Sequence, residues 1–197
     1  KFPLVGKPAS GGSSIGLSIV DGHAELKAAI DLAFCYDKKV IIEEYIEGRE
    51  MTVGIFEDSP LEAIEIKPKM RFFDYRAKYE PGQAEYCVPA PLALATMQLL
   101  KETALKAHKL LGCSYFSRVD IILQNETRPF ILEVNTIPGF TATSLLPKAA
   151  LCKGISFPEL VLRISRAALS THSKATKKSG QKVSLKQNST LAHMHHS

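Results

Sequence analysis

The sequence predicts an α+β fold in which antiparallel sheets are flanked by a few helices. Apolar runs of strand length follow one another at short intervals, and the turns between them are rich in Gly, Pro, Asp and Ser. The runs 50–56 and 61–66, for example, are separated by Glu57-Asp-Ser-Pro, a connection short enough for antiparallel neighbours. Helical spacing of apolar residues is confined to a few longer segments.

The first half of the chain is expected to contain one helix among short strands. Asp21 is a suitable N-cap for a helix over 23–36, because its carboxylate can accept a hydrogen bond from a free backbone N–H of the first turn. Apolar runs bounded by turn residues predict strands at 2–7, 17–20, 39–45, 50–56 and 61–66.

The second half is expected to hold three helices around one hairpin. A short strand at 84–88 precedes a long helix that Pro91 opens and Gly112 closes, which is the usual order of terminators. The other two helices are expected at 144–154 and 156–169, with caps at Thr143 or Ser144 and at Ser156.

The hairpin between these helices carries polar residues inside apolar runs. Asp120 lies within the run 118–123, and Glu133 and Asn135 lie at the end of the run 130–135. Because side chains alternate along a strand, Glu133 and Asn135 point to the same face. Mg2+ prefers oxygen ligands of this kind, usually together with substrate phosphates. The pattern therefore predicts a magnesium site, and an ordinary turn with polar flanks is the alternative.

Two irregular stretches are candidates for anion binding. The loop 8–16 follows Lys7 and contains three glycines and three serines, so its backbone can approach phosphate oxygens closely. No Gly-Lys-Ser/Thr closes it, so it is not a P-loop, and a flexible hairpin loop that binds nothing is an equal alternative. The stretch 67–83 mixes aromatic and basic residues, and a loop of this length is usually functional rather than plain solvated surface.

Length and composition are those of a soluble globular protein. The 197 residues, 45% hydrophobic and 23% charged, fit one large domain or parts of two. No apolar run is long enough to span a bilayer, and the four cysteines are widely spaced, as expected of reduced thiols. We therefore expect a cytoplasmic protein with no membrane partner.

The net charge of +5 comes from the end of the chain. No acidic residue follows Glu159, and the five lysines after Ser170 account for the whole excess. Residues 171–197 are otherwise rich in Ser, Thr and Gln, so we expect them to be disordered. Because the rest of the chain is close to neutral, we expect no nucleic-acid partner.

The pattern Arg-x-Asp … Leu-Glu-x-Asn-x-x-Pro-Gly, which runs from Arg118 to Gly139, resembles the metal-binding end of ATP-grasp ligases. The stretch Glu133-Val-Asn-Thr-Ile-Pro-Gly-Phe-Thr-Ala-Thr-Ser144 resembles the D-alanine–D-alanine ligase family in particular. The resemblance extends from Lys1 to about Leu169.

This resemblance implies an ATP-grasp fold with the N-terminal domain of the family missing. The chain starts at Lys1, without Met and inside an expected strand, so we expect a fragment of a longer protein. The implied divisions are part of the central ATP-binding subdomain at 1–66, the C-terminal catalytic domain with its omega loop at 67–170, and the tail at 171–197.

The implied activity is that of an enzyme, an ATP-dependent ligase that forms a carbon–nitrogen bond. ATP phosphorylates the carboxylate of one D-alanine to give an acyl phosphate, and the amino group of a second D-alanine displaces phosphate. The dipeptide D-Ala-D-Ala serves peptidoglycan synthesis, and hence cell-wall biogenesis and cell shape. The implied cofactors are ATP and two Mg2+ ions, for which Mn2+ is an expected substitute. Because family residues needed for the first D-alanine are missing, we expect this fragment to be inactive alone and monomeric, and the full-length protein to be a homodimer.

Matched one residue at a time, the resemblance implies a nucleotide site. Lys7 would contact the phosphates, Glu50 would hold the ribose hydroxyls, and Lys78 would neutralise phosphate or substrate carboxylate. Adenine would be held, mainly through backbone groups, by Glu43, Glu44, Tyr45 and Ile46. Relatives often carry lysine at position 44, so only a backbone role is carried over there.

The same matching implies a catalytic site. Ser13 would orient the substrate and hydrogen-bond with Tyr79, while Arg118 and the backbone N–H of Gly139 would stabilise the oxyanion of the tetrahedral intermediate. The implied metal ligands are Asp120, Glu133 and Asn135, and the implied acceptors of the second substrate's carboxylate are Ser144 and Leu145.

Two alternative functions stay open on the sequence. One is another ATP-grasp carboxylate–amine ligase, and the other is a nucleotide-binding module without catalysis. The pair Lys78-Tyr79 and the stretch 141–145 favour D-alanine as substrate, and the full set Asp120, Glu133 and Asn135 argues against a module without catalysis.

Overall fold

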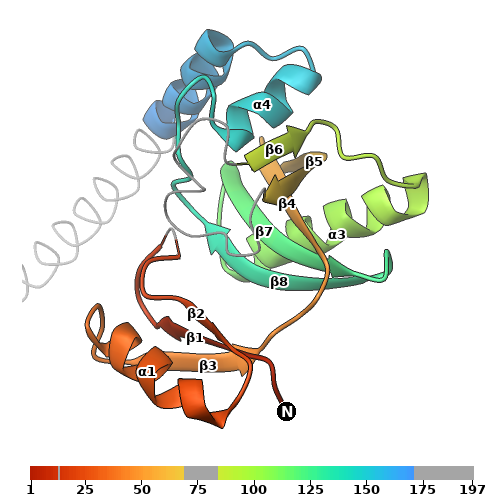
Figure 1. Cartoon of the computed structure of the whole chain (residues 1–197). Helices are drawn as coiled ribbons and strands as arrows, with labels where there is room; N and C mark the ends of the chain where they lie inside the picture. Colours follow the sequence, from red (N-terminus) through yellow and green to blue (C-terminus); the bar gives the residue numbers. More distant parts are fainter. Residues whose placement is uncertain (13, 69–83, 171–197) are drawn as a thin grey trace, which may run out of the picture.

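The computed structural model describes residues 1–12, 14–68 and 84–170. These residues form two antiparallel sheets, and the strand order is β2-β1-β3 in the smaller sheet and β6-β5-β4-β7-β8 in the larger one. Figure 1 shows the smaller sheet with its helix at the N-terminal end and the larger sheet between the remaining helices. The predicted α+β class with antiparallel sheets and flanking helices is confirmed.

The smaller sheet consists of β1 (Leu4–Pro8), β2 (Ser18–Val20) and β3 (Val40–Glu44). Helix α1 (His23–Phe34) buries Ala29 and Ala33, and the small side chain of Ala29 lets the helix lie close to Gly6 of β1. The predicted N-cap Asp21 is wrong, because Gly22 occupies that position and the backbone N–H of Asp21 instead donates to Glu25 Oε2 at 3.0 Å.

The larger sheet is built around β4 (Arg49–Phe56), which pairs with β5 (Ser59–Pro68) on one side and β7 (Phe116–Gln124) on the other. The outer strands are β6 (Ala84–Cys87) and β8 (Arg128–Asn135). All predicted strands are present, but β5 continues to Pro68, into the stretch predicted as a loop from residue 67.

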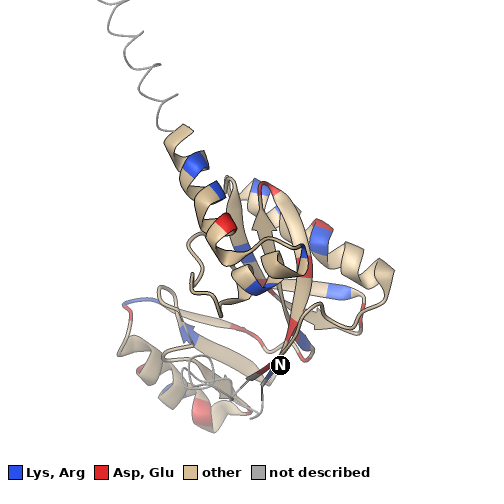
Figure 2. Cartoon of the chain, turned by 90° about the horizontal axis from the view of Figure 1, so that it is seen from above, with Lys and Arg blue, Asp and Glu red and all other residues tan. Residues whose placement is uncertain are grey.

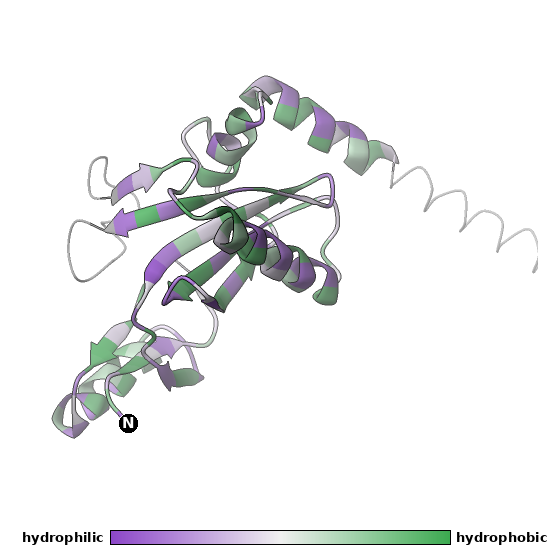
Figure 3. Cartoon of the chain, turned by 90° about the vertical axis from the view of Figure 1, so that its right-hand side faces the viewer, coloured by the Kyte–Doolittle hydropathy of each residue, from purple (hydrophilic) through white to green (hydrophobic). Residues whose placement is uncertain are grey.

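Two hydrophobic clusters cover the two faces of this sheet. On one face, Met51 and Val53 of β4 pack with Leu100 and Ala104 of α3 (Leu94–Leu110). On the other, Leu146 of α4 (Leu145–Cys152) and the helix of residues 157–170 close over the ends of β4 and β5. Figure 3 shows the corresponding alternation of hydrophobic and hydrophilic residues along strands and helices.

Helix ends follow the predictions in most places. Gly112 and Gly154 have φ of 67° and 76°, the left-handed conformation that glycine adopts freely after a helix. The predicted start of the long helix at Pro91 is wrong, because α3 begins at Leu94. The reason is that the backbone before it still belongs to the sheet: the N–H of Ala90 donates to the carbonyl of Ala63 at 2.8 Å.

The predicted domain boundary at 66/67 stays a prediction, yet sheet pairing places a structural division earlier in the chain. Residues 45–48 connect β3 of the smaller sheet to β4 of the larger one, so β4 and β5 belong with β7 rather than with β1. The predicted basic tail 171–197 lies outside the described residues.

The charged residues of the described part of the chain do not gather into a surface of one sign. Figure 2 shows acidic and basic residues interspersed over both sheets and the helices. Within residues 1–12, 14–68 and 84–170, no helix is both long and apolar enough to cross a membrane.

His108 is fully buried in α3. Its Nδ1 lies 2.7 Å from Ser117 Oγ and its Nε2 lies 3.1 Å from Asp58 Oδ1. The backbone N–H of Tyr115 also donates to Asp58, at 2.7 Å, and lowers the pKa of that carboxyl. These contacts tie α3 to the β4–β5 turn, and Ser117 is itself fully buried, so the group is structural.

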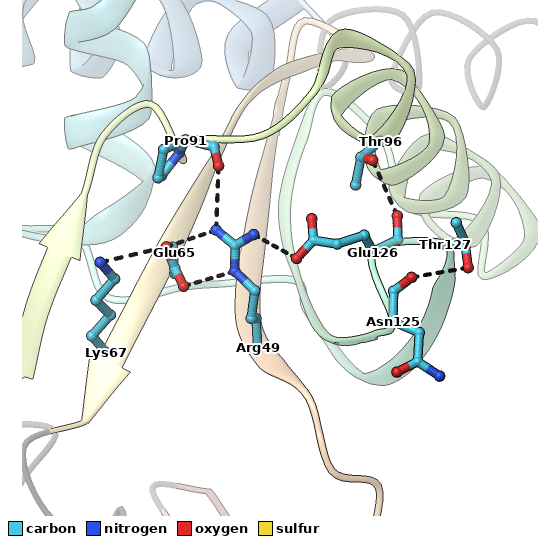
Figure 4. A network of polar contacts seen from close by, with 8 residues as sticks. All are labelled: Arg49, Glu65, Lys67, Pro91, Thr96, Asn125, Glu126 and Thr127. Carbon is cyan, nitrogen blue, oxygen red and sulfur yellow. Dashed lines mark hydrogen bonds and ion pairs between the residues drawn. The ribbon is translucent and has the colours of Figure 1, made fainter.

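A second polar network joins four segments of the larger sheet (Figure 4). The guanidinium of Arg49 donates to Glu65 through Nε at 2.8 Å and Nη2 at 2.9 Å, and to Glu126 through Nη1 at 2.7 Å. The hydrogen bonds from Arg49 lower the pKa of Glu65, and those carboxylates raise the pKa of Arg49. The network thus links β4, β5 and the β7–β8 turn, and Nη2 also reaches the carbonyl of Pro91 at 3.5 Å.

The loss of stability caused by a Leu→Ala substitution on α3 should depend strongly on whether the leucine is buried. Leu100 is 0% exposed, so Leu100→Ala should lower the free energy of unfolding by about 2–5 kcal/mol, through lost burial and the cavity left behind. Leu110→Ala on the same helix, at a side chain 75% exposed, should change it by less than about 0.5 kcal/mol. Urea unfolding followed by circular dichroism measures both, and equal effects would contradict the described packing of α3.

The Arg49–Glu65 pair predicts an acid-sensitive contribution to stability. Because the folded-state pKa of Glu65 lies below its ordinary value of 4.5, the pair stabilises the fold above that pH and loses its effect as the pH falls through the folded value. Glu65→Gln should therefore be less stable than the unchanged protein at pH 7, and the difference should shrink below pH 4.5. Urea titrations from pH 7 to 3 measure it, with Glu102→Gln on the exposed side of α3 as the control; a constant difference would refute it.

Candidate functional site

The hairpin of β7 and β8 brings the predicted metal ligands together. Asp120 lies directly opposite Glu133, and Arg118 lies opposite Asn135 in the strand register. The register shifts immediately after Asp120, since Ile121 pairs with Ile131, so one residue of β8 forms a bulge. The convergence of the three oxygen-bearing side chains on one face is therefore as predicted.

The carboxylate of Asp120 is the centre of this cluster. It is 6% exposed and accepts hydrogen bonds from Thr52 Oγ1 at 2.6 Å and from Arg118 through Nε at 2.9 Å and Nη2 at 2.7 Å. The amide of Asn135 donates to Asp120 at 3.1 Å and to Glu133 at 2.9 Å. Thr52, from β4, was missed by the sequence reasoning because nothing in an ordinary strand threonine distinguishes it.

The donor set fits a hard divalent cation held jointly with a ligand. Two carboxylates and one amide supply oxygens, which Mg2+ prefers. Among the described residues, no group of three or more His, Cys, Asp or Glu side chains could hold a metal ion by itself. The remaining ligands would therefore have to come from phosphate oxygens and water, which is the usual arrangement for Mg2+ at a phosphate site.

A cleft of about 260 Å³ lies between the two sheets. Its walls combine β1 and β3, the connection after β3, and the start of β4 with β7 and β8. In the described part of the chain, every residue predicted to bind the nucleotide lines it: Lys7, Glu43, Glu44, Tyr45, Ile46 and Glu50. Its aliphatic residues, among them Val5, Ile19 and Ile122, give the cleft an apolar wall.

A neighbouring cleft, also of about 260 Å³, joins this site to the hairpin. It is lined by Lys7, by Gly11 and Gly12 of the small-residue loop, and by Asp120 and Glu133. The loop and the Asp120–Glu133 pair therefore line one cleft, and Lys7 lines it with them. The interpretation of the loop as an anion-binding element gains support from this placement.

Lys7 holds an ion pair across the smaller sheet. Its Nζ lies 2.5 Å from Glu43 Oε1, on the neighbouring strand β3. Both side chains are partly exposed and both line the first cleft, so an incoming anionic ligand would compete with Glu43 for the ammonium group.

Three residues that line both clefts, Ser14, Leu17 and Leu132, were not among the predicted site residues. Leu132 lines both clefts, and it is the residue that the bulge in β8 leaves outside the strand register. Ser14 also lines both, with φ of 59°. A bulge has no reliable sequence signal, and nothing in the sequence distinguishes Ser14 from the other two serines of the loop. The serine chosen, Ser13, lies outside the described residues, as do Lys78 and Tyr79.

The predicted substrate end lies where β8 leads into α4. A Cβ placed on Gly139 would lie 3.5 Å from Ser144 Oγ, so these two predicted residues are neighbours. Ser144 is the N-cap of α4, but its hydroxyl accepts from the N–H of Thr141 at 3.0 Å rather than capping the helix. Leu145 starts the helix and packs with the second hydrophobic cluster.

Tyr86 and Lys148 border the same face and were also missed. The ammonium of Lys148 on α4 lies 4.3 Å from the ring centroid of Tyr86 on β6. Burial raises the pKa of Tyr86, and the negative charge of Glu50 raises it further, while Arg118 acts in the opposite direction. The tyrosine therefore lies within electrostatic range of Glu50, which lines the first cleft, and of Arg118 in the hairpin cluster.

Comparison with known proteins agrees with this architecture. The family model described as D-ala D-ala ligase C-terminus matches residues 1–165. The D-alanine–D-alanine ligases of Geotalea uraniireducens and Syntrophotalea carbinolica are each 48% identical over 167 residues, which is 85% of this chain and 54% of each relative. The chain thus spans about half the length of the curated relatives it matches.

Solved structures give the same result. A Bacillus anthracis D-alanine–D-alanine ligase complexed with ATP matches with a TM-score of 0.75 at 33% identity. The match covers 88% of this chain and 55% of the Bacillus anthracis chain. The VanG D-Ala:D-Ser ligase of Enterococcus faecalis has a TM-score of 0.72 at 38% identity, covering 81% and 47%. From the family match, the sequence identity and the shared ATP-grasp fold, we conclude that this chain belongs to the D-alanine–D-alanine ligase family.

Proposed function

We propose that this chain is the ATP- and metal-holding part of a D-alanine–D-alanine ligase that makes the dipeptide for peptidoglycan synthesis. The observation that carries the proposal is that the two clefts are neighbours, with Lys7, Ser14, Leu17 and Leu132 in the walls of both. Six predicted nucleotide-site residues line the first cleft, five from the smaller sheet and the connection 45–48 and the sixth, Glu50, from β4. The second cleft is lined by Lys7 together with Asp120 and Glu133. A ligase that phosphorylates a carboxylate needs this adjacency of triphosphate and cation sites.

In this proposal the substrate ATP occupies the first cleft. Its base would lie along residues 43–46, its ribose against Glu50, and its phosphates between Lys7 and the small-residue loop. The Bacillus anthracis ligase of similar fold is complexed with ATP, which supports ATP as the ligand class. Backbone N–H groups and a lysine are suited to phosphate oxygens because both offer hydrogen-bond donors or positive charge.

Asp120, Glu133 and Asn135 would hold two Mg2+ ions, which neutralise phosphate charge when bound. The protein's own contribution is to aim these oxygens. Arg118 grips Asp120 with two parallel hydrogen bonds, which orients the carboxylate and also fixes the guanidinium plane. The fixed guanidinium would then offer its positive charge to the oxyanion that develops when the amine attacks the acyl phosphate.

The proposed reaction joins two D-alanines. The carboxylate of the first attacks the γ-phosphorus of ATP and releases ADP, and the amino group of the second then attacks the acyl phosphate, losing a proton as phosphate leaves. Arg118 and the N–H of Gly139 would stabilise the oxyanion of the tetrahedral intermediate. Ser144 and Leu145, at the start of α4, would receive the carboxylate of the second substrate.

The roles of Ser13, Lys78 and Tyr79 remain part of the proposal, with the lysine–tyrosine pair favouring D-alanine as the second substrate. D-Serine is the second candidate, because a D-Ala:D-Ser ligase is 38% identical to this chain and similar in fold. We also propose a cytoplasmic location and, for the whole protein, a homodimer.

Removal of one metal ligand should uncouple nucleotide affinity from Mg2+. Asp120→Asn loses a negative charge at the centre of the cluster, so the affinity for Mg2+·ATP should fall by about tenfold or more, while affinity for metal-free ATP should change little. Isothermal titration calorimetry with and without Mg2+ measures both. Asp31→Asn, which removes an exposed carboxylate paired with Lys27 on α1, is the matched control. An unchanged Mg2+ dependence in Asp120→Asn would show that the cluster holds no metal.

We propose that ligase activity requires the part of the relatives' length that residues 1–197 do not span. The chain alone should bind Mg2+·ATP but show little D-alanine-dependent phosphate release. Fused behind the N-terminal part of the Geotalea uraniireducens relative, it should release phosphate with D-alanine, less with D-serine and none with L-alanine. The same fusion with Glu133→Gln is the inactive control. A fusion that binds ATP but releases no phosphate with any D-amino acid would overturn the proposed function.

A further inference from the structure

The connection from β3 to β4, residues 45–48, forms part of the nucleotide cleft without belonging to either sheet. Only a few contacts hold it. The N–H of Tyr45 donates to the carbonyl of Pro3 at 3.2 Å, and the amide of Gln124 reaches the carbonyl of Glu47 at 3.5 Å. At Gly48 a Cβ would lie only 2.6 Å from the carbonyl oxygen of Leu123, so the backbone passes directly against β7.

The next residue, Arg49, is held from three directions, as Figure 4 shows. Its forked pair of bonds to Glu65 fixes it to β5, its bond to Glu126 fixes it to the β7–β8 turn, and a long contact reaches the carbonyl of Pro91 ahead of α3. The β7–β8 turn is itself fixed to α3, since Thr96 Oγ1 donates to the carbonyl of Glu126 at 3.1 Å.

This clamp is partly shielded from solvent. The side chain of Glu65 is 8% exposed and that of Arg49 is 28% exposed. A two-point guanidinium–carboxylate pair sets orientation as well as distance, and a buried one is not loosened by water as an exposed pair is. Arg49 is thus anchored at a defined position relative to the larger sheet.

The clamp and the cleft lie on opposite faces of one strand. Side chains alternate along β4, so Arg49 points to the face that also carries Met51 and α3, while Glu50 points to the cleft. Adjacent residues share one backbone, so whatever fixes Arg49 also fixes Glu50 and the carbonyl of Gly48. Loss of the clamp would leave the first residue of β4 anchored only by ladder hydrogen bonds at a strand end, where strands fray.

We propose that Arg49 is a positioning residue for nucleotide recognition, which acts through the backbone to hold Glu50 and the connection 45–48 against the ribose and base of ATP. The proposal rests on the proposed function, because it assigns the cleft to a nucleotide. Arg49 itself does not line that cleft.

The test compares Arg49→Met with a matched loss of an ion pair elsewhere. Arg49→Met keeps the aliphatic stem and removes the clamp, so the dissociation constant for Mg2+·ATP should rise about tenfold, since a small misplacement of binding groups is costly. Lys101→Met removes the 2.6 Å pair with Glu62, which joins α3 to β5 and lies outside the described clefts. It should lower the melting temperature comparably and change ATP affinity less than about twofold.

A second readout separates positioning from general stability. If Glu50 contacts the ribose, the unchanged protein should prefer ATP to 2′-deoxy-ATP or 3′-deoxy-ATP, and Arg49→Met should lose most of that preference. Arg49→Lys keeps the charge but not the fork, so it should restore stability more than it restores the preference. A double variant, Arg49→Met with Glu65→Met, should bind ATP no better than Arg49→Met. Two apolar side chains can fill the space of the ion pair, but they do not restore the orientation of Glu50 and the connection 45–48.

The outcomes distinguish the two proposals. Unchanged ATP affinity and ribose preference in Arg49→Met, with binding by the unchanged protein intact, would overturn the positioning role and leave the proposed function standing. Equal losses in Arg49→Met and Lys101→Met would also overturn it, because stability alone would explain them. An unchanged protein that fails to bind Mg2+·ATP would overturn the proposed function and this inference with it.

Discussion

The buried carboxylate of Asp120 is the interaction on which the candidate site depends. A charge with so little exposure is costly unless it is fully paired, and here an arginine, a threonine and an asparagine all donate to it. The donors come from three adjacent strands, so the charge can be accommodated only when β4, β7 and β8 are in register. The same bonds that satisfy Asp120 also bring Glu133 and Asn135 beside it.

The two sheets divide the proposed work between them. The smaller sheet contributes a lysine and a loop of small residues, both suited to phosphate, and the larger sheet contributes oxygen ligands suited to a cation. Neither surface alone is a complete site for a metal-bound triphosphate. The connection 45–48 and its anchor Arg49 are therefore more than a link between elements, since they define where the two surfaces meet.

Much of the fold was predictable from local sequence because its signals are local. Apolar runs between turn residues marked each strand, and glycines at 112 and 154 marked two helix ends. The errors arose where longer-range contacts override local preference. Pro91 could open a helix, but the preceding backbone hydrogen-bonds to β5 and delays α3 to Leu94. Asp21 could cap a helix, but its neighbour Gly22 takes that place.

The sequence by itself determined the types of side chain at the candidate site, their order and the alternation that places Glu133 and Asn135 on one face. Those features follow from covalent spacing and strand geometry, which need no partner. Only the tertiary structure decided that Thr52 completes the shell of Asp120, that a bulge brings Leu132 to the cleft, and that Arg49 is clamped behind Glu50. Each of these depends on strands far apart in the chain lying side by side, and the register between such strands is set by packing of the whole sheet rather than by any one segment.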